Sequence, residues 1–169
     1  MSTLYLVCGA PFSGKTTLAK KIISKTEFEY VSTDDIMRKR GFDPSRVNPI
    51  EEWEKTHKEC LQILSELMNK NLNIVFDDTN FLKKLRNRLR AVADMYKYKV
   101  VTIFMDISLD ELEKRRIMVS KVKDRMHLDD NAFYPVVKGF EKPDETENTV
   151  LFGATDNYDD WLLSHFNCA

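Results

Sequence analysis

The chain has 169 residues, 43% of them apolar, which suits one domain with a substantial core. A formal net charge of −1 excludes a protein whose overall positive charge attracts nucleic acid. A nucleic-acid substrate would therefore have to bind at a local basic site. Three widely spaced cysteines exclude a disulfide framework, and with no signal-peptide pattern and no long apolar span we expect a soluble, cytoplasmic protein without a membrane partner.

The first element along the chain is an apolar run over residues 4–8, which predicts a buried strand. A glycine-rich loop follows, and after it residues 18–23 show the spacing of a helix with one apolar face. The loop matches the pattern G-x-x-x-x-G-K-[ST] in its strand, loop and helix setting, with the residues Gly9, Ala10, Pro11, Phe12, Ser13, Gly14, Lys15 and Thr16.

This pattern is typical of a loop that binds nucleotide phosphates. Gly9 and Gly14 let the backbone turn tightly and bring its N–H groups close to phosphate oxygens, and the following helix adds its positive end. Lys15 can reach the β- and γ-phosphates, and the Thr16 hydroxyl can ligate Mg²⁺. Thr17 is either a contact to the α-phosphate or an ordinary first-turn residue.

Strands and helices alternate over the rest of the chain. We expect strands over 28–31, 73–76, 99–105 and 149–152, and helices from near Asn48 to Met68, over 82–96, from Ser108, over 129–133 and over 158–166. This order predicts an α/β fold: a three-layer sandwich with a central, mostly parallel sheet of about five strands and helices on both faces, in a single domain over 1–169. His57 falls on the apolar side of its helix, where a half-buried histidine is expected more than a ligand.

In such a sheet, polar residues that follow the strands meet at one edge. Asp34 and Asp35 follow the second strand, and Arg38 comes within one helical turn of them. A kinase needs a base for the acceptor hydroxyl and a clamp for an anionic group on the acceptor, and these residues suit both tasks. They also suit a plain helix start with acidic residues in its first turn.

A second acidic strand end is Asp77-Asp78-Thr79-Asn80. A carboxylate at this strand end either holds Mg²⁺ or its waters or orients side chains near the acceptor. The same residues could also simply form the cap of the next helix. Asp106, at another strand end, is a weaker candidate for the same task.

Two basic segments complete the set of motifs. The segment 115–130 contains Arg115, Arg116 and Arg125 and lies where a lid would close over the nucleotide, although a solvated helix tail has the same composition. The five basic residues between 83 and 90 could grip a polynucleotide backbone, but a solvated outer helix face is favoured for them: Lys83, Lys84, Arg86, Arg88 and Arg90.

Together the motifs resemble a group of small P-loop kinases that includes the kinase domain of phage-type 5′-polynucleotide kinases, the zeta toxins, chloramphenicol phosphotransferase and seryl-tRNA kinase. Polynucleotide kinase is the nearest match, and the resemblance covers nearly the whole chain. The residues that carry it are the loop from Gly9 to Thr17, the D-x-x-R element Asp35 to Arg38, Asp78-Thr79-Asn80, the lid arginines Arg115, Arg116 and Arg125, and the segment Gly139 to Pro143.

The resemblance implies ATP and Mg²⁺ as cofactors and assigns roles by position. Asp35, favoured over Asp34 on this ground, would be the general base, and Arg38 would bind a phosphate beside the acceptor hydroxyl. Arg125 would contact the transition state, and Arg116 the nucleotide, while Asp78 and Asn80 would bind the substrate. The chain departs from the group in its adjacent lid arginines and lysine-rich lid, and we expect no appended phosphatase or ligase domain.

Three functions remain open from the sequence. The first is a kinase that phosphorylates the 5′-hydroxyl of RNA or DNA, and the second is a kinase for a nucleoside, sugar or antibiotic hydroxyl. The third is an ATPase or switch without an acceptor. A guanine switch would carry N-K-x-D, and the chain has Asn69-Lys70-Asn71-Leu72 instead.

Overall fold

The computed structural model describes residues 1–122 and 128–166. Its strands are β1 (Thr3–Cys8), β2 (Glu29–Ser32), β3 (Ile74–Asp77), β4 (Lys99–Asp106) and β5 (Thr149–Gly153). Its helices are α1 (Lys15–Lys25), α2 (Thr33–Lys39), α3 (Ile50–Asn69), α4 (Lys83–Met95), α5 (Leu109–Ser120), α6 (Asp130–Lys138) and α7 (Tyr158–His165), with a short 3₁₀ turn, η1, at Glu145–Glu147.

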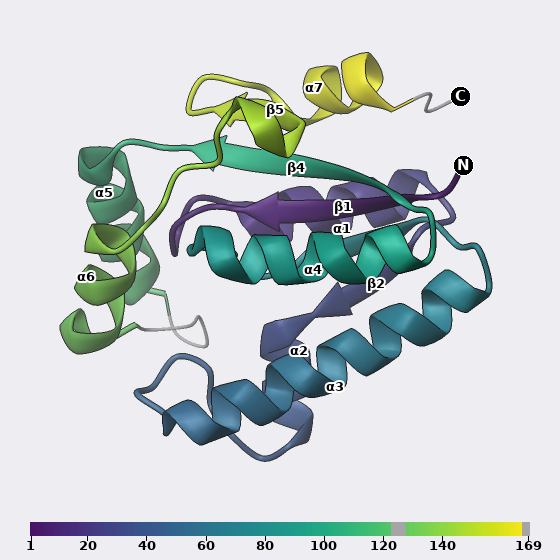
Figure 1. The fold of residues 1–169 in the computed structure, drawn as a ribbon. Helices are drawn as coiled ribbons and strands as arrows, with labels where there is room; N and C mark the ends of the chain where they lie inside the picture. The colour runs from purple at the N-terminus through teal and green to yellow at the C-terminus, as the bar shows by residue number, and fades with distance from the viewer. Residues whose placement is uncertain (123–127, 167–169) are drawn as a thin grey trace.

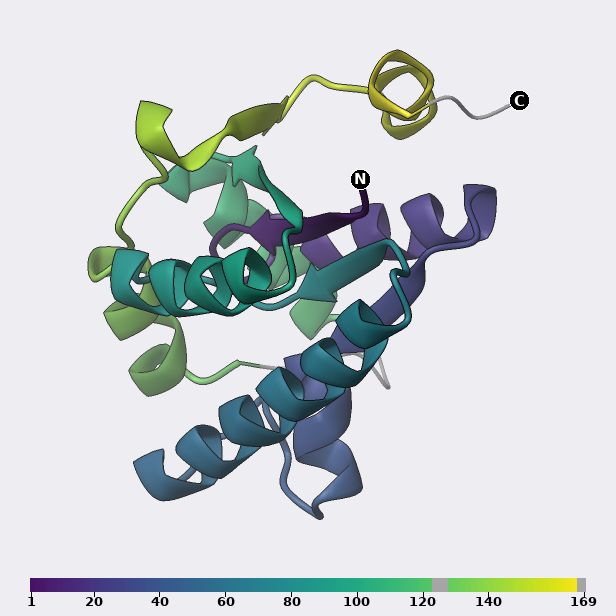
Figure 2. The same cartoon turned by 45° about the vertical axis from the view of Figure 1, so that its right-hand side comes forward.

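The five strands form one parallel sheet in the order β2-β3-β1-β4-β5, as predicted. Helices α3 and α4 cover one face and α1 and α7 the other, so the molecule has three layers (Figures 1 and 2). The central strand β1 contributes to both cores, because Leu4 and Leu6 face α3 and α4 while Val7 faces α1 and α7. The thiols of Cys8 and Cys60 are buried and free.

The element boundaries differ from the prediction at three places. Residues 33–39 form the helix α2, which begins because the Ser32 hydroxyl accepts the backbone N–H of Asp35 at 3.3 Å. Helix α6 continues to Lys138, past Phe133, and the side chain of Asp129 makes no capping hydrogen bond. The turn η1 was not predicted, and it carries a capping box formed by Asp144 and Glu147.

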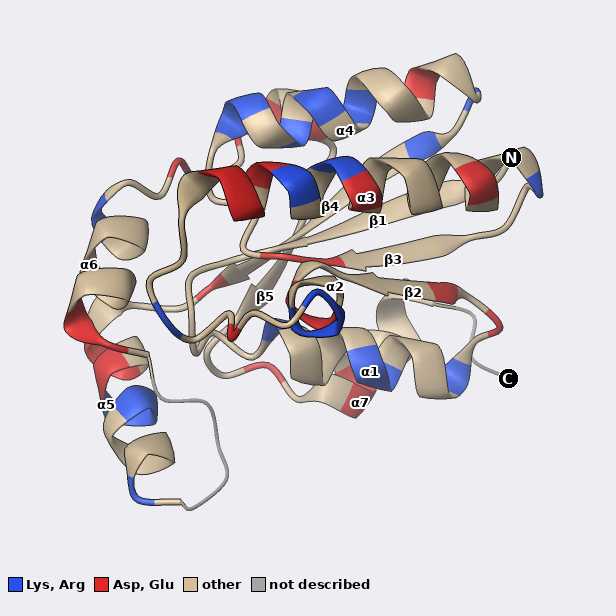
Figure 3. Cartoon of the chain, turned by 90° about the horizontal axis from the view of Figure 1, so that it is seen from below, with Lys and Arg blue, Asp and Glu red and all other residues tan. Residues whose placement is uncertain are grey.

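Helices α5 and α6 lie beyond the carboxyl ends of the strands, away from the two covered faces (Figures 1 and 3). The phosphate loop between β1 and α1, the start of α2 and the turn after β3 lie at the same edge, since the strands are parallel. Among the described residues, no helix is long and apolar enough to cross a membrane.

Candidate nucleotide-binding site

The loop between β1 and α1 has the geometry of an anion site. Gly14 stands at φ 98°, and a Cβ there would lie 2.5 Å from the Tyr158 hydroxyl oxygen. At Gly9 a Cβ would lie 2.8 Å from the Cβ of Met105, so both positions require glycine. No side chain caps the start of α1 and its first turn holds no acid, which leaves the first N–H groups and the dipole available to an anion.

Lys15 begins α1, and its ammonium group lies over the loop. Its Nζ donates to the carbonyl oxygen of Ala10 at 2.9 Å, and burial lowers the pKa of Lys15. The carboxylates of Asp77, Asp34 and Asp78 act in the opposite direction and favour the charged form. The structure therefore brings one cation and three acids together at the edge where the sequence predicted that they would converge.

The three acids differ in their surroundings. Asp77 is 4% exposed and accepts a hydrogen bond from the Tyr30 hydroxyl at 2.8 Å. Burial alone would raise the pKa of Asp78, but the interaction with His57, whose Nε2 lies 3.7 Å from the carboxylate, leaves it lowered. Burial, followed by repulsion from Asp78, raises the pKa of Asp34 to about 6.

The neighbouring acids of α2 take different partners. Asp35 Oδ1 accepts from Arg38 Nη1 at 2.8 Å, and both side chains are about half exposed. Asp34 is 4.0 Å from the same guanidinium, and its charge favours the charged form of Lys15. Asp35 and Arg38 thus form a unit beside the acid cluster, while Asp34 belongs to the cluster itself.

The turn after β3 is fastened to the base of the phosphate loop. Asn80, expected to contact substrate, is fully buried at φ 48°, and its Nδ2 donates to the carbonyl oxygen of Val7 at 2.8 Å. The N–H of Gly9 donates to the carbonyl oxygen of Thr79 at 3.1 Å. The Asn80 side chain therefore holds the turn after β3, which carries Asp78, against the end of β1.

Arg86 corrects the expectation of an outer basic face on α4. It is fully buried and donates to both carboxylate oxygens of Glu147, at 2.7 and 2.9 Å, and to the carbonyl oxygen of Asn80 at 2.8 Å. Arg90 adds a second ion pair to Glu147 at 2.8 Å. Lys84 and Arg88 are exposed on α4, as expected.

The predicted lid is described in part. Arg115 Nη1 donates to the carbonyl oxygen of Ser13 at 3.1 Å, so this arginine touches the phosphate loop directly. Arg116 pairs with Asp130 and lies over the ring of Phe133, its guanidinium carbon 4.8 Å from the ring centroid. Arg125 lies outside the described residues.

The oxygen donors at this edge fit a magnesium ion that arrives with its nucleotide. The Thr16 side chain is exposed in the first turn of α1, and the acid cluster stands near Lys15. Within residues 1–122 and 128–166, no three ligand-type side chains form a ready metal centre. Magnesium commonly takes only one or two protein oxygens and completes its shell with phosphate and water, so Thr16 is the residue we expect to hold it. Asp106 is engaged elsewhere, 3.0 Å from the ammonium of Lys142.

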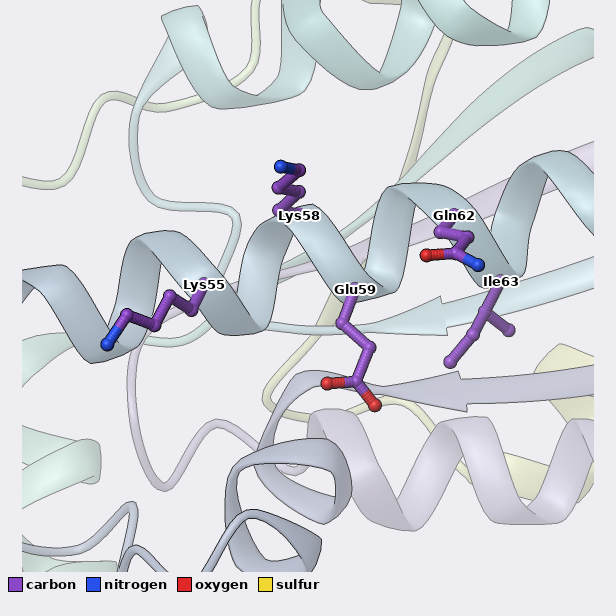
Figure 4. Close-up of a pocket in the computed structure, with 5 residues that line it drawn as sticks. All are labelled: Lys55, Lys58, Glu59, Gln62 and Ile63. Atoms are coloured by element: carbon purple, nitrogen blue, oxygen red, sulfur yellow. The ribbon is translucent and has the colours of Figure 1, made fainter.

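A separate hollow lies along α3 (Figure 4). None of the predicted site residues that the structure describes lines this hollow, and it does not bear on the phosphate loop. Its lining residues are Lys55, Lys58, Glu59, Gln62 and Ile63.

Comparison with known proteins assigns the family. A family model described as AAA domain matches residues 4–143, and the chain belongs to this family. A 2′,3′-cyclic-nucleotide 3′-phosphodiesterase of Rattus norvegicus is 32% identical over 104 residues, which are 60% of this chain and 23% of that protein. An adenylate kinase of Mycoplasma mycoides subsp. mycoides SC is 30% identical over 118 residues, 65% of this chain and 55% of that protein. The chain therefore spans only part of the length of these relatives.

Solved structures share the fold. A sugar kinase from Janibacter sp. superposes with a TM-score of 0.74 at 14% identity, over 99% of this chain and 94% of that one. A chain of the Pnkp1/Rnl/Hen1 RNA repair complex superposes with a TM-score of 0.68 at 23% identity, over 82% of this chain and 43% of that one. These likenesses establish a P-loop kinase-like fold.

Proposed function

We propose that this member of the AAA domain family is a kinase that transfers the γ-phosphoryl group of ATP to an alcohol, and that the alcohol is the 5′-hydroxyl of a polynucleotide. The observation that carries the proposal is the acid cluster beside Lys15. Burial raises the pKa of Asp34 in this cluster to about 6, which suits a general base for an acceptor hydroxyl near neutral pH.

The transfer follows from the position of each group. The loop N–H groups and Lys15 would hold the β- and γ-phosphates, and Thr16 would hold Mg²⁺, which neutralises phosphate charge. The acceptor oxygen forms a bond to the γ-phosphorus as the bond to the ADP oxygen breaks, and the hydroxyl proton passes to a carboxylate. The surroundings favour Asp34 as that carboxylate, while Asp35, favoured by the sequence resemblance, is paired with Arg38.

The arginines would neutralise negative charge on the acceptor and on the nucleotide, on the two sides of the transferred phosphoryl group. Arg38 would bind a phosphate on the acceptor, with Asp35 fixing its direction. Arg115, which contacts the phosphate loop, and Arg116 would stabilise the nucleotide, and Arg125 is proposed as the contact to the transition state.

Two likenesses support a polynucleotide acceptor. The fold is shared with a chain of an RNA repair complex, and one relative is named for the 2′,3′-cyclic nucleotides on which it acts. The net charge of −1 and the sugar kinase fold favour the second candidate, a small-molecule hydroxyl.

The test is γ-labelled ATP offered with a panel of acceptors: 5′-hydroxyl RNA and DNA oligonucleotides, tRNA, nucleosides and aminoglycoside-like alcohols. We expect label on the 5′ end of an oligonucleotide, and no transfer by Lys15→Ala. Label on a small alcohol alone would show that the acceptor is a small molecule and not a polynucleotide. Release of phosphate to water with every acceptor would overturn the kinase assignment.

A matched pair of variants identifies the base. Asp34→Asn should abolish transfer and retain MgATP binding, whereas Asp35→Asn should mainly raise the KM for an acceptor that carries a phosphate. The reverse result would assign the base to Asp35, as the sequence resemblance predicts.

A further inference from the structure

The phosphate loop contains one residue whose backbone conformation is unusual for its side chain. Phe12 stands at φ 66°, in the left-handed region. The four other non-glycine residues with positive φ in the described ranges are three asparagines and a lysine. Asparagine enters this region readily, whereas a bulky aromatic residue is strained there, so other contacts must hold Phe12 in place.

The Phe12 ring finds its contact on α6. Its centroid is 5.9 Å from that of Phe133, with the ring planes tilted by 55°. Phe133 is fully buried and is the single buried residue of α6. Because the rest of this helix is at least partly exposed, the phosphate loop supplies part of the surface that buries its one anchor.

Contacts between side chains join α6 to α5. Arg116 of α5 lies over Phe133 and pairs with Asp130, and the Tyr134 hydroxyl donates to Glu113 Oε1 at 3.0 Å. The two helices therefore form one unit, which we call the α5–α6 pair (109–120 and 130–138). It stands beyond the ends of the strands (Figure 1).

Two consecutive loop residues hold this pair. The Phe12 ring packs on α6, and the next residue, Ser13, accepts a hydrogen bond from Arg115 of α5 at its carbonyl oxygen. The same stretch of backbone is the one whose N–H groups face the nucleotide in the proposed function. A change in the loop on nucleotide binding would therefore act on both helices, and a change in the helices would in turn act on nucleotide binding.

We propose that Phe12 is a positioning residue that docks the α5–α6 pair onto the phosphate loop, so that Arg115 and Arg116 stand beside the nucleotide site before a nucleotide arrives. The docking of the α5–α6 pair in the nucleotide-free protein is inferred from the structure alone. The effect of nucleotide on this docking rests on the proposed function.

The experiment is amide hydrogen exchange on the full chain without nucleotide. Phe12→Gly keeps the left-handed backbone accessible and removes the ring, and Phe133→Leu is the matched change on the other side of the contact. In both variants we expect exchange in 130–138 to rise by about ten-fold, the factor that corresponds to an aromatic contact, with β1 and α1 unchanged. Unchanged exchange in 130–138, or an equal rise in β1, would overturn the proposal.

The coupling is read with MgADP as the probe. In the wild type MgADP should slow exchange in 130–138, and Phe12→Gly should reduce this slowing and bind MgADP several-fold more weakly. Slowing of the same size in both proteins would overturn the coupling. If the wild type binds no MgADP, the proposed function fails, and exchange in the free protein still decides whether Phe12 docks the helices.

Discussion

Replacing Asp34 by asparagine should stabilise the protein at pH 7.5 while it abolishes phosphoryl transfer. Burial and repulsion from Asp78 raise the pKa of Asp34 from 3.8 to about 6. A carboxyl group whose pKa is raised on folding contributes stability below its unfolded pKa, and this contribution is lost as the pH rises through the folded value. At pH 7.5 the ionised Asp34 therefore opposes folding.

The expected gain in stability follows from the pKa shift of Asp34 and the exposed fraction of its side chain. A rise of about two pKa units corresponds to about 3 kcal/mol if no solvent screens the charge. The Asp34 side chain is 38% exposed, so screening reduces the expected gain for Asp34→Asn to about 1–2 kcal/mol at pH 7.5, shrinking toward pH 4.

Urea unfolding measures this gain, with the fluorescence of Trp53 and Trp161 as the signal and without nucleotide or Mg²⁺. The control is Asp35→Asn, which breaks a half-exposed pair with Arg38 and should lower the free energy of unfolding by less than about 1 kcal/mol. An Asp34→Asn protein that is no more stable than wild type at pH 7.5 would refute the electrostatic reasoning. The rate of phosphoryl transfer by the wild type should rise as the pH increases through about 6, because the ionised Asp34 is the form that accepts the proton.

Three further changes test other parts of the structure. Glu147→Gln leaves buried guanidinium groups without a counter-charge and should lower the free energy of unfolding by about 3–5 kcal/mol, against less than about 1 kcal/mol for Lys21→Met at an exposed ion pair; similar losses in both would contradict the burial argument. Gly14→Ala places a side chain at φ 98° and should weaken MgATP binding measured by calorimetry at least ten-fold. Tyr158→Phe in the same chain should not restore binding, because backbone strain dominates over the contact with the flexible ring; rescue would show that the hydroxyl is the obstacle. Arg38→Gln should raise the KM for a phosphorylated acceptor and leave the KM for ATP unchanged, and an equal rise in both would argue against an acceptor clamp.

The phosphate loop could be predicted from the sequence because its signal is local. An apolar strand, glycines at fixed spacing and a helical pattern lie within 25 residues, and the structure places all of them as expected. The five-strand parallel sheet followed from the alternation of elements in the same way.

The roles of Asp34 and Asp35 depend on where α2 begins. A shift of one residue turns a helical side chain by about 100°, so the partner of each acid is set by the Ser32 cap. The sequence resemblance favoured Asp35 from its spacing to Arg38, which the structure explains as an ion pair within one turn. That spacing alone does not show which of the two acids acts as the base.

The burial of Arg86 was missed because its partner is remote. Glu147 lies 61 residues further along the chain, and no local pattern connects them. One signal was present: Arg86 shares a helical stripe with Leu89 and Ala93, both buried. His57 is half-buried, as predicted, but its partner Asp78 could not be named without the arrangement of α3 against β3.

The ion pair between Arg86 and Glu147 also bears on where this folding unit ends. Similarity to the family stops at residue 143, four positions before the carboxylate that neutralises Arg86. A fragment cut at that boundary would retain every motif named in the sequence, but Arg86 in α4, beside the turn that presents Asp78, would lose its counter-charge. The end of the family match is therefore not the end of the folding unit, which must extend at least through Glu147.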